Sequence, residues 1–133
     1  MRRPDWQEVL FRVCREWKNE LFGYGTNDCC LFAARCVDAI TGSDWVSELG
    51  AHYWDKRSAL SYISDIGGIG AGATARLGPP VSRLNARRGD VCLVEADTGY
   101  SLSVCVGDRV IGPGIDGQYS RPLSDVICAW RID

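Results

Sequence analysis

The sequence places two adjacent cysteines, Cys29 and Cys30, at the start of a predicted helix. A glycine-containing turn over residues 24–28 precedes them. Asn27 or Asp28 can cap the helix, because a short side-chain oxygen accepts hydrogen bonds from the free N–H groups of its first turn. These N–H groups and the positive end of the helix dipole favour a thiolate at this position. Nucleophilic thiol chemistry, if this chain performs any, would therefore start at this pair.

A buried helix is predicted to carry the cysteine pair, and Gly42 stands where its C-terminal stop is expected. Between the two caps, apolar residues recur at three- and four-residue steps, so one face of the helix should be buried. The residues on this face are Cys29, Phe32, Ala33, Cys36, Val37 and Ile40. The core of the domain is thus expected to fix the position of the pair.

The chain contains seven cysteines, a high number for its length. The number is odd, and several of them fall inside helix or strand patterns, so we expect reduced, buried thiols and not a disulfide framework. No Cys-x-x-Cys is present, and Cys29, Cys30 and Cys36 lack the spacing of a standard ligand set. No metal or other cofactor is predicted, and a thiol-ligated metal or cluster is kept as an alternative.

Length and composition are those of one globular domain spanning residues 1–133, with 46% apolar and 24% charged residues. The net charge of −2 and the scattered arginines give no reason to expect nucleic-acid binding. No apolar run reaches the roughly 18 residues that a membrane span requires. The basic N-terminal segment has no apolar stretch behind it, so no signal peptide is predicted.

The first half of the chain, from about residue 4 to 68, has helical patterns on both sides of the cysteine helix. Residues 5–21 repeat apolar side chains at helical spacing, and Asp5 with Glu8 resembles a capping box. A loop is predicted over residues 43–54, which hold the only histidine, His52. A shorter helix is predicted over residues 55–66.

A glycine-rich connector is predicted over about residues 67–80, beginning with the run Gly-Gly-Ile-Gly-Ala-Gly-Ala over residues 67–73. This run invites comparison with a phosphate-binding loop, but no Gly-Lys-Ser/Thr follows it and no strand precedes it. The sequence therefore predicts a flexible or close-packed connector here, and no nucleotide site.

The second half, from about residue 81 to 133, changes to strand patterns. Leu102, Val104 and Val106 alternate with more polar neighbours, which is typical of a half-buried strand. Strands are predicted at residues 91–96, 101–106, 109–111, 119–123 and 126–132, with turns at 98–99 and 112–114. Helices followed by a meander of strands predict an α+β fold with a mostly antiparallel C-terminal sheet.

The order of these motifs resembles the NlpC-type cysteine peptidases, the bacterial papain-like hydrolases of cell walls. In that family a Tyr-containing turn leads to Asp-Cys-Ser at the start of a buried helix, and the matching residues here are Tyr24, Asp28, Cys29 and Cys30. Gly89-Asp90 matches the Gly-Asp before the first core strand of the family, and residues 100–107 match its next strand. The resemblance implies a papain-like fold with Cys29 as the nucleophile.

The overall layout is also similar to a group of small phage-encoded proteins of this superfamily, found among tail genes. Those proteins share an N-terminal Trp helix, an Asn-Asp-Cys-Cys-Leu-Phe-Ala-Ala-like core, a Thr-Gly-x-Asp helix end and a C-terminal Ala-Trp-Arg-Ile. The matching residues here are Trp6, 27–34, 41–44 and 129–132. This resemblance covers nearly the whole chain and implies a phage tail protein.

The sequence departs from the peptidase pattern at the residues that would move protons. The general base of the family falls at Ser101, and no polar residue near Gly112 matches its third, orienting residue. Without a proton donor for the leaving amine, amide hydrolysis loses the factor of about 10²–10⁴ that general acid–base catalysis supplies. His52 is a candidate substitute base, and Asp28, Cys30 and Ser101 are the predicted neighbours of the site.

The resemblance therefore implies a structural or assembly component of a phage tail, at its tip, built on an NlpC-like fold with a degenerate active site. Such a protein would be made in the host cytoplasm and incorporated into the virion tail. Its partners would be other tail-tip or hub proteins. A first alternative is an active tail-tip peptidase in which Cys29 attacks peptide amides of peptidoglycan. A second is the thiol-ligated metal or cluster protein.

Overall fold

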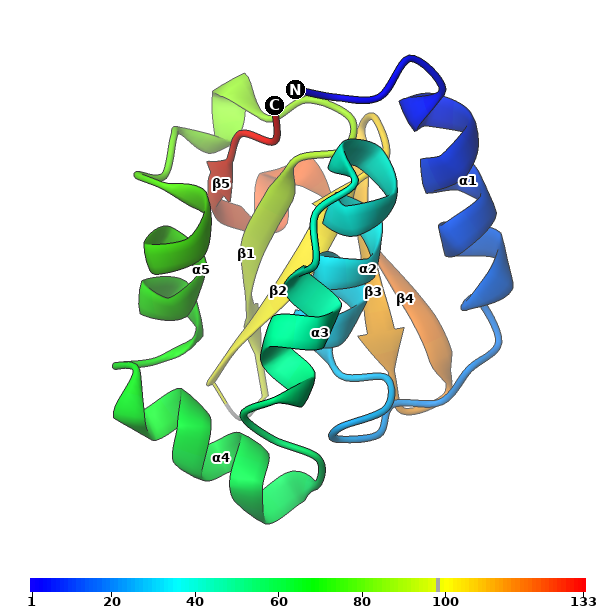
Figure 1. Cartoon of the computed structure of the whole chain (residues 1–133). Helices are drawn as coiled ribbons and strands as arrows, with labels where there is room; N and C mark the ends of the chain where they lie inside the picture. The colour runs from blue at the N-terminus through cyan, green and yellow to red at the C-terminus, as the bar shows by residue number, and fades with distance from the viewer. Residues whose placement is uncertain (98) are drawn as a thin grey trace.

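A computed structural model describes residues 1–97 and 99–133 of the chain, in which helices pack on one antiparallel sheet (Figure 1). This confirms the α+β class, with N-terminal helices packed on a five-stranded antiparallel C-terminal sheet. Helix α2 packs on strands β2 (Gly99–Cys105) and β3 (Arg109–Gly114), α1 and α3 pack on α2, and α5 lies against β2 and β5 (Val126–Trp130). The helices are α1 (Trp6–Glu16), α2 (Cys29–Thr41), α3 (Trp45–Gly50), α4 (Lys56–Asp65) and α5 (Ile69–Leu77).

The central helix α2 begins and ends at the predicted residues. Asp28 caps its start, where the carboxylate accepts a hydrogen bond from the N–H of Leu31 at 2.9 Å. Gly42 ends it in the left-handed conformation, at a φ of 77° that residues with a side chain adopt at a cost. The whole predicted apolar face is buried, and Leu31 and Ala34 are buried with it.

Helix α1 is shorter than predicted, because it ends at Glu16 and not at residue 21. The main chain beyond it bonds to strand β4 (Gly117–Pro122) and does not continue the helix: the carbonyl of Lys18 accepts from the N–H of Gln118 at 3.0 Å. The predicted capping box is also wrong, since the Asp5 side chain makes no capping bond and pairs with Arg3 at 3.3 Å.

Two segments predicted as loop and connector are helical. Helix α3 interrupts the predicted loop over residues 43–54, because the carboxylate of Asp38 on α2 accepts from the N–H groups of Trp45 and Val46, both at 2.9 Å. Helix α5 occupies most of the predicted connector over residues 67–80, and Thr74 on it accepts from the indole N–H of Trp130 at 3.1 Å. Helix α4 agrees with the prediction over residues 55–66.

The sheet has the strand order β4-β3-β2-β1-β5, and every neighbouring pair is antiparallel. The predicted turn at residues 112–114 is wrong: these residues end strand β3 and pair with residues 117–119, so the chain reverses at residues 115–116. Thr98, in the other predicted turn, lies outside the described residues. The remaining strands are β1 (Val91–Ala96), β2 (Gly99–Cys105), β3 (Arg109–Gly114) and β5 (Val126–Trp130).

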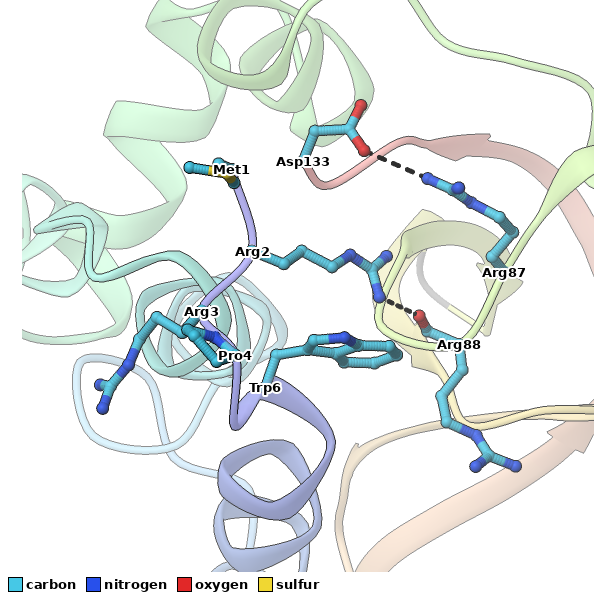
Figure 2. A pocket seen from close by; sticks show the side chains of 8 residues that line it. All are labelled: Met1, Arg2, Arg3, Pro4, Trp6, Arg87, Arg88 and Asp133. Carbon is cyan, nitrogen blue, oxygen red and sulfur yellow. Dashed lines mark hydrogen bonds and ion pairs between the residues drawn. The ribbon is translucent and has the colours of Figure 1, made fainter.

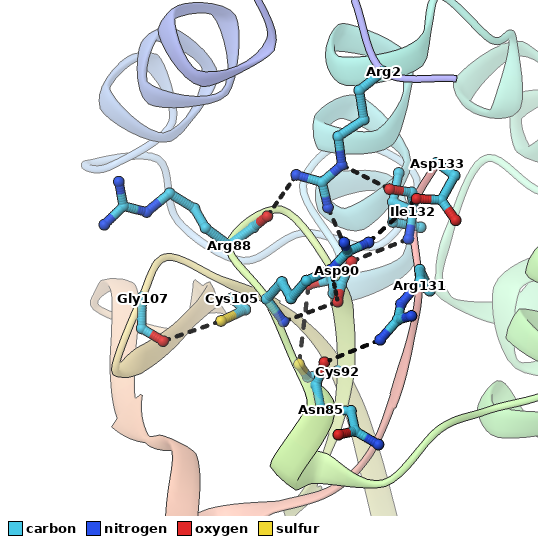
Figure 3. A network of polar contacts seen from close by, with 11 residues as sticks. Arg2, Asn85, Arg88, Asp90, Cys92, Cys105, Gly107, Arg131, Ile132 and Asp133 are labelled. Atoms are coloured by element: carbon cyan, nitrogen blue, oxygen red, sulfur yellow. Dashed lines mark hydrogen bonds and ion pairs between the residues drawn. The ribbon is translucent and has the colours of Figure 1, made fainter.

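Asp90 stands at the entrance to β1 with no solvent exposure and joins both ends of the chain (Figure 3). Its Oδ1 accepts from the guanidinium of Arg2 and from the N–H of Ile132, both at 3.0 Å, and its Oδ2 accepts from the N–H of Arg87 at 2.9 Å. Arg2 also donates to the carbonyl of Ile132 at 2.7 Å. The Gly-Asp motif thus serves as a buried structural anchor.

Within the described residues, no helix has the length and apolar character needed to cross a membrane.

Candidate thiol site

The loop before α2 is fixed by Asp28, whose side chain is almost fully buried. Besides capping the helix, its carboxylate accepts from the N–H of Gly25 at 2.9 Å and from the hydroxyl of Tyr53 at 2.8 Å. Burial, and then the charge of Asp28, raise the pKa of Tyr53, so its phenol stays protonated and donates. Asp28 therefore positions the start of the helix, and its oxygens are occupied by structural bonds.

Gly25 is the tightest point of this loop. Its φ is 80°, and a Cβ placed on it would lie 2.2 Å from the carbonyl oxygen of Trp54. We expect Gly25→Ala to lower the free energy of unfolding by about 2 kcal/mol or more, because left-handed strain and a backbone overlap add together. Urea denaturation measures the change.

Gly42→Ala is the matched control for this substitution. Its φ of 77° is similar, but nothing lies within 4 Å of the added Cβ. Only the conformational cost of about 1–2 kcal/mol remains there. Equal losses in the two variants would contradict the close packing of the loop against Trp54.

Cys29 lies in the first turn of α2 with 8% of its surface exposed. A hydrogen bond from the thiol of Cys30 has the largest effect on the pKa of Cys29 and lowers it. Burial has the opposite effect and raises this pKa, but by less. The main-chain N–H of Leu102 and the hydroxyl of Ser101 also lower the pKa of Cys29, and the charge of Asp28 raises it. Cys29 is therefore a buried thiol whose thiolate form is favoured by donors from two elements.

The sheet supplies these donors where two of its strands diverge. Strands β2 and β3 pair only at Val104 with Ile111 and at Cys105 with Val110. Ser101 and Leu102 lie beyond these two pairs, where β2 has no partner on β3. The hydroxyl of Ser101 and the N–H of Leu102 can therefore bond to the thiol of Cys29. The structure thus brings Cys29, Cys30 and Ser101 together.

Tyr119 completes the site from strand β4, and the sequence analysis missed it. Its hydroxyl lies 3.2 Å from that of Ser101 and donates to the carbonyl of Leu102 at 3.4 Å. A Cβ on the facing Gly112 would lie 2.5 Å from this hydroxyl, so the tyrosine occupies the space above that glycine. Burial raises the pKa of Tyr119 to about 12, which keeps its proton on the oxygen.

His52 contributes to a different surface. Its ring stacks on Tyr62, with the two ring centroids 4.7 Å apart. Both rings line a cavity of about 340 Å³ that also includes Cys30 and Leu102, whereas Cys29 is not among its lining residues. The structure therefore brings His52 to the same cavity as Cys30.

The other cysteines lie apart from this site. Cys14 on α1 hydrogen-bonds to Cys36 on α2, and Cys92 and Cys105 belong to a second apolar cluster on the sheet. Among the residues that the structure describes, no three His, Cys, Asp or Glu side chains are grouped closely enough to hold a metal ion.

A larger cavity of about 900 Å³ lies near the chain ends and is lined by arginines (Figure 2). The guanidinium of Arg2 is occupied by the Asp90 network, and Arg87 pairs with Asp133 at 3.2 Å. Figure 2 shows Arg3 and Arg88 pointing away from each other. The positive groups therefore do not converge on a common point, and this cavity is not the candidate site.

Cys30→Ala is expected to raise the pKa of Cys29, because it removes the donor with the largest lowering effect. Cys30→Ser keeps a donor and should change the pKa less. The measurement is the pH dependence of alkylation at Cys29, located by mass spectrometry. Cys14→Ala, which removes a thiol that contacts Cys36, is the control and should leave the midpoint unchanged. An unchanged midpoint in Cys30→Ala would contradict the thiol–thiol contact.

A family model described as "Domain of unknown function (DUF6950)" matches residues 1–132 of the chain. No curated protein matches the sequence.

Proposed function

We propose that this chain, which belongs to the DUF6950 family, is a structural component of a phage tail, at its tip, built on a papain-like, NlpC-like fold. In this proposal Cys29 occupies the place of a catalytic nucleophile and does not hydrolyse amides. The resemblance of the sequence to tail-encoded relatives motivates the role. The fold supports it in outline, since a cysteine begins a buried helix that packs on an antiparallel sheet.

One observation carries the non-hydrolytic part of the proposal: among the described residues, the side-chain hydroxyl groups beside Cys29 are those of Ser101 and Tyr119, and neither takes up a proton near neutral pH as a general base would. Ser101 stands where the peptidases that the sequence resembles have their general base. Burial raises the pKa of the neighbouring Tyr119 to about 12, so its phenol is protonated at neutral pH. A thiolate can attack a carbonyl without help, but an amine leaves only after it receives a proton. In the part of the chain that the structure describes, the site can therefore hold a thiolate, but neither hydroxyl group can take up the thiol proton and return it to the leaving amine as a histidine would.

The surface supports an assembly role. Large apolar side chains are exposed on several separate elements, and such residues supply the anchors of protein interfaces. They are Phe11, Leu21, Trp54, Leu60, Leu84, Tyr100, Ile115 and Ile127.

The test is genetic and structural, in the phage or prophage that encodes the chain. Deletion of the gene should abolish complete tails, whereas Cys29→Ala should assemble tails and infect as the unchanged phage does. Electron microscopy of particles and plaque counts are the two readouts. Complete tails in the deletion would overturn the structural role. Complete tails that fail to infect when Cys29 is replaced would favour catalysis.

An active peptidase is the second candidate, favoured by the lowered pKa of Cys29. In this case Cys29 attacks a peptide amide of peptidoglycan, N–H groups at the start of α2 stabilise the oxyanion, and a partner subunit supplies the missing proton. Assembled tails, and not the isolated chain, would then release peptides from purified cell wall. Cys29→Ala would abolish that release.

A further inference from the structure

The cavity beside Cys30 is built from four helices, and Cys29 is not among its lining residues. Helices α2, α3, α4 and α5 contribute to it, together with Leu102 from the sheet. Most of its lining is apolar, with Trp45, Leu49, Ile63, Ile66, Ile69 and Ala73 as the main contributors. Its volume of about 340 Å³ lies within the range of small-molecule sites in proteins.

The charges that line this cavity cancel each other. Arg76 on α5 and Glu48 on α3 form an ion pair of 2.7 Å, and the guanidinium also lies 5.8 Å from the centre of the Trp45 ring. Both charged side chains of the lining are thus already paired, although they are partly exposed to solvent, and they offer a charged ligand no free counter-charge. The cavity therefore favours an uncharged occupant.

Besides the ion pair, the side chains of Cys30, His52 and Tyr62 bring polar atoms to the lining of the cavity. Cys30 donates its proton toward Cys29, and this bond together with burial raises the pKa of Cys30, so its thiol stays neutral. The rings of His52 and Tyr62, stacked on each other, make one part of the lining aromatic. A few polar groups in a mostly apolar cavity fix the orientation of a ligand, while the apolar contacts supply most of its affinity.

We propose that this cavity is a binding site for a small, uncharged, mainly apolar ligand with an aromatic body. The ligand packs against the His52–Tyr62 pair and covers the thiol of Cys30. Its binding does not depend on whether Cys29 is catalytic or on whether the chain assembles into a tail.

The test uses two fluorescent probes that differ in charge. N-phenyl-1-naphthylamine is neutral, and 1-anilinonaphthalene-8-sulfonate carries a sulfonate on the same ring system. We expect the neutral probe to bind the full chain saturably at one site, and the anionic probe to bind about tenfold more weakly or worse, which corresponds to about 1.4 kcal/mol. The bound neutral probe should slow alkylation of Cys30, located by mass spectrometry.

Two variants of α5 provide the structural control. Ala75 is exposed and lines the cavity, so Ala75→Trp should obstruct it and weaken binding of the neutral probe by about tenfold or more. Ala71 is exposed on the same helix and is not among the lining residues, so Ala71→Trp should bind the probe normally. Circular dichroism checks that both variants are folded.

Three results would overturn the proposal. They are the absence of saturable binding of the neutral probe, equal or tighter binding of the anionic probe, and normal binding of the neutral probe to folded Ala75→Trp. None of them bears on the proposed tail function, which is tested by particle assembly.

Discussion

Asp90→Ala is expected to lower the free energy of unfolding by about 3–5 kcal/mol. The substitution leaves the largely buried guanidinium of Arg2 without its carboxylate, and the N–H groups of Ile132 and Arg87 without their acceptor. An uncompensated buried charge costs more than the ion pair contributes, because the partner is left desolvated. Urea denaturation followed by tryptophan fluorescence measures the loss.

The pair between Arg121 and Asp125 is the matched control for this result. It joins two partly exposed side chains at 3.1 Å, so Asp125→Ala should cost about 0–1 kcal/mol. Asp90→Asn retains one acceptor oxygen and should fall between the two. If Asp90→Ala were no more damaging than Asp125→Ala, the carboxylate would not be the anchor that the buried network implies.

Ser101→His is expected to give Cys29 a general base and to accelerate its chemistry by about 10²-fold or more near neutral pH. Position 101 already lies within hydrogen-bonding reach of the thiol, and the strand there is unpaired toward β3. The imidazole would take up the thiol proton and hold the thiolate as an ion pair, and with an amide substrate it would return that proton to the leaving amine. Release of nitrophenolate from p-nitrophenyl acetate, whose leaving group needs no proton, measures the rate of attack by the thiolate.

Ser101→Gln is the control, because glutamine is about as long as histidine but does not titrate. This variant should release nitrophenolate at the same rate as the unchanged chain. The double variant Ser101→His with Cys29→Ala should lose the whole gain, which shows that the reaction passes through Cys29. Folded Ser101→His without any gain would contradict the assignment of residue 101 to the position of the base. The papain-like part of the proposed function would then lose its support.

Local sequence patterns were sufficient for the elements whose signals are self-contained. The cysteine helix was predicted to within a residue, because its cap at Asp28, its stop at Gly42 and its apolar face lie within one continuous segment. Strand β2 was recognisable from alternation alone. These signals need no knowledge of distant residues.

The wrong predictions share a physical cause, which is that distant partners decide the local structure. Helix α3 depends on capping by Asp38, which lies on another helix. Helix α5 is rich in glycine, whose helix propensity is low, and it is supported by packing against the sheet. Residues 112–114 look like a turn, yet strand β4 pairs with them.

The candidate site was predictable only where a motif carried it. Cys29, Cys30, Asp28 and Ser101 were found in this way. Tyr119 was missed, although a large residue facing Gly112 in the adjacent strand could have indicated it. The cavity beside Cys30 was also missed, because it is lined by the two helices that were predicted as loop and connector.

The Asp90 network has a consequence for the way in which the chain folds. Its donors come from residues 2, 87 and 132, so the carboxylate cannot be fully bonded until both ends of the chain are present. Contacts of such large sequence separation carry the highest loop-closure entropy and are expected to form late. During synthesis on the ribosome, the carboxylate of Asp90 would therefore lack its bond from Ile132 until residue 132 has emerged, even if strands β1 to β4 have already paired. Substitutions at Asp90 should accordingly speed unfolding more than they slow folding.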